Sequence, residues 1–134
     1  MAIFPTDEWI QALCQKLNSD KQYAQVAHKW EGDLRFIIEP GGSIQDTRCF
    51  YADLWHGKCR QIFFETNLDA IKPAFILKAP YPQMVRILMG ELDPMTALMT
   101  RKLGVQGNMA VLMRNVPTVL DFVRCCREVT TGVL

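Results

Sequence analysis

The side chains that most often carry out chemistry are few in this sequence, and they are scattered along it. Only two histidines are present, His28 and His56. Neither has a serine, cysteine or carboxylate at a spacing that indicates a catalytic set. His28 falls near the end of a predicted helix and His56 in a predicted turn, so we interpret both as structural or exposed. We therefore predict no catalytic residues and a protein that is not an enzyme.

The five cysteines could in principle bind zinc or form disulfides. The sequence has no Cys-x-x-Cys pair, which both kinds of site commonly use. Cys49 and Cys59 flank the His56-Gly57 turn and are expected to be close on paired strands, while Cys125-Cys126 point about 100° apart on a helix. An odd number of cysteines without regular spacing suits free thiols in a reducing cytoplasm. We expect a cytoplasmic protein with no metal and no cofactor.

A short glycine motif raises the question of nucleic acid. Gly104-Val105-Gln106-Gly107 follows the basic pair Arg101-Lys102, and RNA-binding KH modules clamp the RNA backbone with a G-x-x-G loop. The longer phosphate-binding P-loop pattern is absent. The net charge is only +1, which gives no electrostatic basis for binding a polyanion. We expect no nucleic-acid partner.

Methionines gather in one stretch of the chain. Six of the seven lie between residues 84 and 113. Methionine is unbranched and polarisable, so it adapts to irregular or changing neighbours. An ordinary core filled with flexible side chains explains this pattern, and so does a wall that reshapes around an apolar ligand. The six are Met84, Met89, Met95, Met99, Met109 and Met113.

The sequence predicts that a helix, a short strand and a second helix over residues 94–115 present these methionines. Asp93 is expected to cap the first helix, with Pro94 at its first position, where a missing N–H has no consequence. Gly104 is expected to end this helix, and residues 103–106 to form the strand. One apolar stripe of the first helix then consists of Met95, Leu98 and Met99.

Gly107 and Asn108 separate the strand from the second helix. Gly107 is expected to hold a positive φ or a close backbone approach, which glycine tolerates best. Asn108 is expected to cap the helix. The apolar face of this helix consists of Met109, Leu112 and Met113.

The remaining elements indicate an α+β fold. Thr6 is expected to cap a helix over residues 7–17, and a capping box at Ser19 to start a second one that Gly32 ends. The period then changes to two, which predicts an antiparallel meander over residues 32–65 with a hairpin turn at His56-Gly57. A strand over residues 74–79 and a helix ending at Gly90 follow. At 134 residues the chain is expected to form a single domain, residues 1–134.

The last predicted helix, residues 117–129, has apolar side chains over about half its surface, Leu120 and Val123 among them. The break at Asn115-Val116-Pro117 could act as a hinge. We therefore predict that this helix is a lid. No apolar run approaches the ~20 residues needed to span a bilayer, and residues 1–8 do not have the pattern of a signal peptide.

Residues 98–109, Leu-Met-Thr-Arg-Lys-Leu-Gly-Val-Gln-Gly-Asn-Met, resemble the signature of the sterol carrier protein type 2 domain family. The typical form is a short helix, a Lys-Leu-x-Val/Ile-x-Gly strand, and Asn or Asp opening a helix with Met or Leu at helical spacing. Residues 90–94, Gly-Glu-Leu-Asp-Pro, also resemble the family's entry to this region. The order of predicted elements is similar to the family's over nearly the whole chain.

The resemblance implies a five-stranded, mainly antiparallel sheet packed with helices around an apolar tunnel. It implies non-catalytic binding or transfer of a fatty acid, acyl-CoA, phospholipid or sterol-like ligand, with transient membrane contact. Residues 131–134 are not a Ser-Lys-Leu-type address, which favours a stand-alone prokaryotic member. The alternative is an accessory domain that binds a protein partner through its apolar face and carries no lipid. The expected ligand-binding side chains are Met84, Leu88, Met95, Leu98, Met99, Met109, Leu112, Met113, Leu120 and Val123.

Overall fold

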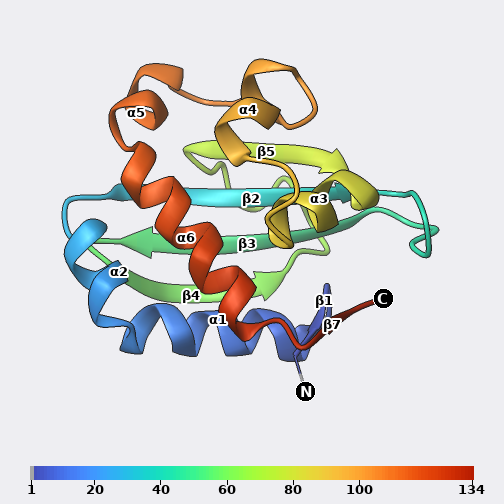
Figure 1. Cartoon of the computed structure of the whole chain (residues 1–134), viewed down its shortest axis with the longest axis horizontal. Helices are drawn as coiled ribbons and strands as arrows, with labels where there is room; N and C mark the ends of the chain where they lie inside the picture. Colours follow the sequence, from blue (N-terminus) through green and yellow to red (C-terminus); the bar gives the residue numbers. More distant parts are fainter. Residues whose placement is uncertain (1) are drawn as a thin grey trace.

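The computed structural model describes residues 2–134 and arranges helices on one face of a five-stranded sheet (Figure 1). In these residues no helix is both long enough and apolar enough to cross a bilayer. The elements, in chain order, are β1 (Ile3–Phe4), α1 (Asp7–Ser19), α2 (Lys21–Val26), β2 (Glu31–Glu39), β3 (Arg48–Trp55), β4 (Lys58–Phe64), β5 (Phe75–Pro80), α3 (Tyr81–Leu88), α4 (Pro94–Met99), β6 (Gly104–Gln106), α5 (Met109–Arg114), α6 (Val116–Val129) and β7 (Gly132–Val133).

The sheet has the order β4-β3-β2-β5-β6. β2, β3 and β4 form the predicted antiparallel meander. The hairpin between β3 and β4 turns at His56 and Gly57, whose φ angles of 51° and 79° are both positive, as tight hairpins require. β5 runs parallel to β2, and β6 runs antiparallel to β5. The predicted α+β class and mainly antiparallel sheet are therefore confirmed.

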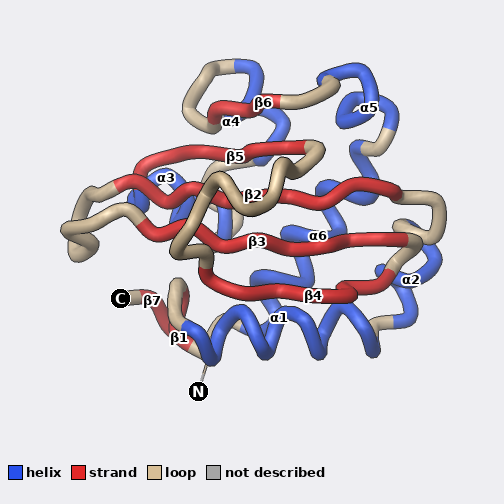
Figure 2. The backbone as a smooth tube through the Cα atoms, turned by 180° about the vertical axis from the view of Figure 1, so that it is seen from behind, coloured by secondary structure: helices blue, strands red, loops and turns tan. Residues whose placement is uncertain are grey.

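The two faces of the sheet are covered differently. Leu34 and Phe36 of β2 face the helices, as the alternating pattern predicts. Arg35 between them is buried on the other face. Its guanidinium donates to both carboxylate oxygens of Glu65 at 2.8 Å and to the carbonyls of Leu68 and Ile71 at 3.0 and 2.8 Å. This arginine holds the connector between β4 and β5 against the back of the sheet (Figure 2).

The first two helices differ in detail from their prediction. Thr6 caps α1 by accepting from the Trp9 N–H at 3.4 Å. The cap of α2 is Asp20, not Ser19, because the Asp20 carboxylate accepts from the Tyr23 N–H at 2.8 Å. Gly32 does not end this helix, because α2 stops at Val26 and Gly32 lies within β2. The short pairing of β1 with β7 was not predicted.

The helix–strand–helix region, α4, β6 and α5, forms a cap over one end of the core (residues 94–114; Figure 1). Asp93 caps α4 through the Thr96 N–H at 2.9 Å, and Asn108 caps α5 through the Ala110 N–H at 3.0 Å. Both caps are as predicted. The role given to Gly104 was wrong, because α4 already ends at Met99 and the chain turns afterwards at Arg101, where φ is 62°.

The last helix, α6, lies diagonally across the helical face of the sheet (Figure 1). It buries Phe122, Cys125 and Cys126, and Cys125 has no exposed surface. Its polar side is joined to α1 and α2 by ion pairs, of which Arg124 to Asp20 at 2.6 Å is the shortest. These contacts make α6 a wall of the core, and its opening as a lid stays a prediction.

Candidate functional site: an apolar cavity beneath the cap

An apolar cavity of ≈ 100 Å³ lies between the sheet and α6, with the cap at one end. Side chains from the sheet, from α2 and α3 and from the cap surround it. Because these elements come from distant parts of the sequence, the cavity exists only in the folded chain. The lining consists of Tyr23, Trp30, Leu34, Phe36, Leu54, Leu77, Met84, Ile87, Pro94, Leu98, Leu103, Leu112, Thr118, Val119, Phe122 and Val123.

A second apolar cavity of ≈ 70 Å³ continues from the first toward α1 and the other end of α6. The two cavities share five lining residues: Phe36, Met84, Ile87, Phe122 and Val123. The rings of Phe36 and Phe122 stack with centroids 5.8 Å apart and an interplanar angle of 7°. Both rings line both cavities, so this aromatic pair stands where the two cavities adjoin.

Two of the polar side chains that line the main cavity are hydrogen-bonded to backbone carbonyls. The Thr118 hydroxyl donates to the Val26 carbonyl at 3.2 Å, and the Trp30 indole N–H donates to the Gly32 carbonyl at 2.9 Å. Among residues 2–134, no buried side-chain nitrogen or oxygen lacks a hydrogen-bond partner. The side chains of this lining carry no charge and are mostly apolar, so the cavity suits a hydrocarbon chain.

The expected ligand-binding residues divide into two groups. Met84, Leu98, Leu112 and Val123 line the main cavity, and Leu88 lines the second. The other group lies outside both linings, with Met95 half-buried and four side chains exposed by 76%, 39%, 48% and 41%: Met99, Met109, Met113 and Leu120.

On each helix of the cap, part of the predicted apolar stripe faces the cavity and part faces solvent. Leu98 points into the cavity and the next residue, Met99, points out of it; Leu112 and Met113 repeat this arrangement. A stripe at i, i+3 and i+4 spans enough of a helix that the sequence does not show which edge meets the core. Contact of the outer residues with a ligand stays a prediction.

Twelve of the sixteen residues that line the main cavity were not among the expected ligand-binding residues. Tyr23, Trp30, Leu34, Phe36 and Leu54 come from α2, the segment after it and the sheet. The alternation of Leu34 and Phe36 with Arg35 was a usable signal, because it shows which side chains face inward. It does not distinguish a side chain packed in a core from one that borders a cavity.

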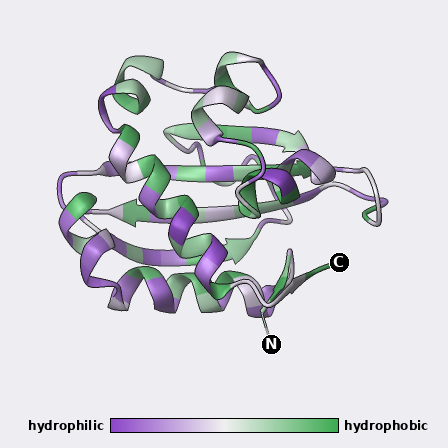
Figure 3. Cartoon of the chain, viewed as in Figure 1, coloured by the Kyte–Doolittle hydropathy of each residue, from purple (hydrophilic) through white to green (hydrophobic). Residues whose placement is uncertain are grey.

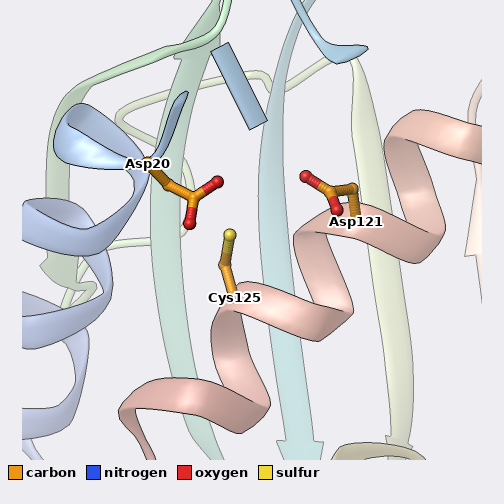
Figure 4. Close-up of side chains that lie close together, drawn as sticks. All are labelled: Asp20, Asp121 and Cys125. Atoms are coloured by element: carbon orange, nitrogen blue, oxygen red, sulfur yellow. The ribbon is translucent and has the colours of Figure 1, made fainter. Parts of the chain in front are cut away.

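One cluster of possible metal ligands joins α6 to the junction of α1 and α2. Asp20 faces Asp121 and Cys125 (Figure 4), with potential ligand atoms within 4.8 Å of one another. The Arg124 guanidinium donates to Asp20 at 2.6 Å and to Asp121 at 2.7 Å, so it already supplies the positive charge. This contact, helped by the Tyr23 N–H and Lys16, holds the pKa of Asp20 well below its usual range.

The charges of this cluster are balanced within the protein. Burial raises the pKa of the Cys125 thiol to about 11, and Arg124 pairs with both carboxylates. The cluster therefore acts as an ion-pair network that fastens α6. The expected proximity of Cys49 and Cys59 is also wrong, because Cys59 pairs with Leu54 whereas Cys49 lies opposite Ile37 at the other end of β3.

Known proteins share this fold and sequence pattern. Residues 10–119 match the SCP-2 sterol transfer family. A crystal structure of sterol carrier protein 2 is 30% identical, with a TM-score of 0.82 over 92% of this chain and 96% of that one. A conserved hypothetical protein from Thermus thermophilus, a candidate sterol carrier protein, is also 30% identical, with a TM-score of 0.85 over 98% and 93% of the two chains.

More distant structures share the fold alone. The sterol carrier protein 2 of Aedes aegypti, solved in complex with the C16 fatty acid palmitate, is 19% identical, with a TM-score of 0.57 over 89% of this chain and 94% of that one. No curated protein sequence matches this chain.

Proposed function

The chain belongs to the SCP-2 sterol transfer family, and from that premise we propose that it binds and transfers a lipid whose hydrocarbon chain enters the cavity beneath the cap. The observation that carries this proposal is the lining itself, which is mostly apolar and contains no charged side chain. The distant relative from Aedes aegypti holds palmitate, which supports a long-chain fatty acid as the first ligand to test. The ligand class extends to acyl-CoA, phospholipid and sterol-like molecules.

The cavity must grow when such a ligand binds. At ≈ 100 Å³ it is smaller than the roughly 150 Å³ cavity that accommodates benzene. Burying ~15 methylenes gives about 12 kcal/mol gross at ~0.8 kcal/mol each. Immobilising the chain and opening the site offset several kcal/mol of this. The remaining 7–8 kcal/mol, roughly, corresponds to a dissociation constant near micromolar.

The cap is the element that we expect to move. The sheet is joined by continuous strand pairing, and α6 is fastened to the first helices by the Arg124–Asp20 and Lys16–Glu128 ion pairs. The two short helices of the cap, by contrast, contribute Leu98 and Leu112 to the cavity wall while exposing much of their outer surface.

A blocking substitution tests the proposal. Val119 lines the main cavity, whereas its neighbour Leu120 is exposed and lies outside both linings. We expect Val119→Trp to fill part of the cavity and weaken binding of a fluorescent long-chain fatty acid at least about tenfold. Leu120→Trp adds a similar side chain to the same helix and should bind like the wild type. Titration of both variants, with circular dichroism melts to verify folding, makes the comparison.

Two results would contradict the proposal. One is the absence of saturable binding to the wild-type protein. The other is equal affinity in the Val119→Trp and Leu120→Trp variants, which would place the ligand outside this cavity. Native mass spectrometry of freshly purified protein gives an independent measure, because a retained lipid adds its mass to the folded chain.

A further inference from the structure

One end of the molecule exposes apolar and basic side chains together. α4, α5 and the first turns of α6 meet there (Figures 1 and 3). Met99, Met109, Met113 and Leu120 on these helices are exposed. They make up four of the nine large exposed hydrophobic side chains found in residues 2–134. The other five are spread over loops, strands and the end of α3, so exposed apolar surface is concentrated at this end.

Positive charge is concentrated at the same end of the molecule. Residues 94–120 contain Arg101, Lys102 and Arg114 and no acidic residue, whereas the rest of the chain has twelve basic and fourteen acidic residues. All three cations are exposed. Within the described residues none of them forms an ion pair. Lys16, Arg35 and Arg124 elsewhere in the chain each pair with a carboxylate.

We propose that this surface, the exposed side of residues 94–120, docks on an anionic lipid membrane. Unbranched methionines suit the boundary between headgroups and acyl chains, where apolar side chains of a surface-bound helix insert. Arg101, Lys102 and Arg114 have long, unpaired side chains that can reach lipid phosphates without rearranging existing ion pairs. Each cation near an anionic surface strengthens binding about fivefold.

The position of this surface relates it to the cavity. Met99 and Met113 lie one residue beyond Leu98 and Leu112, which line the cavity from inside. A membrane that receives the outer side chains would therefore contact the same short helices that we expect to move when a lipid enters. The exchange of a lipid after docking rests on the proposed function, whereas docking itself does not.

Vesicle sedimentation with the full chain tests the docking surface. Vesicles of phosphatidylcholine alone are compared with vesicles of an equimolar mixture of phosphatidylcholine and phosphatidylglycerol. Neutralising the three cations (R101Q, K102Q and R114Q together) should weaken binding to the mixed vesicles about a hundredfold. Changing three exposed lysines outside residues 94–120 (K21Q, K29Q and K58Q) alters the net charge equally and should have a much smaller effect. Added salt should also release the wild-type protein.

A second set of variants tests the apolar side chains of this surface. M99S with M113S should lower binding to the mixed vesicles several-fold, while M89S, at an exposed methionine of α3's end, should leave it unchanged. Equal binding to the two vesicle types, or equal effects of the cap and control triples, would overturn the proposal. So would wild-type protein that ignores vesicles and instead binds an acidic protein through these cations.

Fatty-acid titration in solution separates the two proposals. If the R101Q, K102Q and R114Q variant keeps its affinity for free fatty acid but leaves the vesicles, docking and ligand binding are distinct, as we propose. If this variant loses fatty-acid affinity as well, the cations serve the ligand site, and the docking assignment is overturned.

Discussion

At the scale of single residues, Gly107 shows how backbone conformation can be inferred from sequence. Its position between a strand and an Asn cap predicted a positive φ or a close approach, and the structure has both. The φ angle is 134°, and a Cβ atom at this site would lie 2.5 Å from Cδ1 of Phe75. Gly104 belongs to the same motif, yet its Cβ would meet only the Lys78 carbonyl at 3.5 Å, an ordinary contact.

These two glycines make a matched pair for stability measurements. Gly107→Ala forces a strained backbone and a clash with a buried aromatic ring, so we expect it to lower the free energy of unfolding by about 2 kcal/mol or more. Gly104→Ala should change it by less than about 0.5 kcal/mol. Urea unfolding followed by circular dichroism measures both. Similar midpoints for the two variants would show that the cap accommodates a Cβ at Gly107.

At the scale of elements, the sequence predicted the features that depend on neighbouring residues, namely helix caps and a hairpin turn. The caps at Thr6, Asp93 and Asn108 and the His56-Gly57 turn depend on neighbouring residues, and all four are present in the structure. The ion pairs that join α6 to the first helices could not be predicted, because they are not local. Arg124 reaches Asp20, which lies 104 residues earlier in the chain, and no sequence period reveals such a contact.

The ion pair between Asp20 and Arg124 of α6 predicts that the free energy of unfolding depends on pH. Because the folded-state pKa of Asp20 is lowered, mainly by its hydrogen bond with Arg124, its contribution is fully present above the unfolded pKa of about 3.9. That contribution is lost as the pH falls below this value toward the lowered folded pKa. Asp20→Asn can still cap α2 but carries no charge, so it should destabilise the protein by about 2 kcal/mol at neutral pH.

Urea unfolding at several pH values checks this expectation. Between neutral pH and the acid limb, the wild type should lose more stability than Asp20→Asn, so the two curves should converge below about pH 4. Asp46→Asn is the control, because Asp46 is an exposed loop residue that forms none of these ion pairs. A constant difference between the wild type and Asp20→Asn across the whole range would contradict the assignment.

At the scale of the whole molecule, the fold could be predicted and the cavity could not. The change of period from helix to strand and back, together with the resemblance over residues 90–109, indicated the five-stranded sheet and its helices. The cavity depends on how Trp30, Leu54 and Val119 meet, and these side chains come from the segment after α2, from β3 and from α6. A fully packed core would contain the same apolar residues. Composition therefore does not show where a cavity remains between them.

Because the stacked rings of Phe36 and Phe122 stand between the two cavities, we expect affinity for a fatty acid to rise with chain length in two stages. Short fatty acids should gain about 0.8 kcal/mol per added methylene until they reach the rings. The next methylenes should gain little, because turning the pair aside costs about 0.5–1.5 kcal/mol of stacking energy, and the gain should then resume in the second cavity. Affinities for a homologous series of fatty acids should show one plateau. Phe122→Leu should erase this plateau, whereas Phe63→Leu, on the other face of the sheet, should keep it.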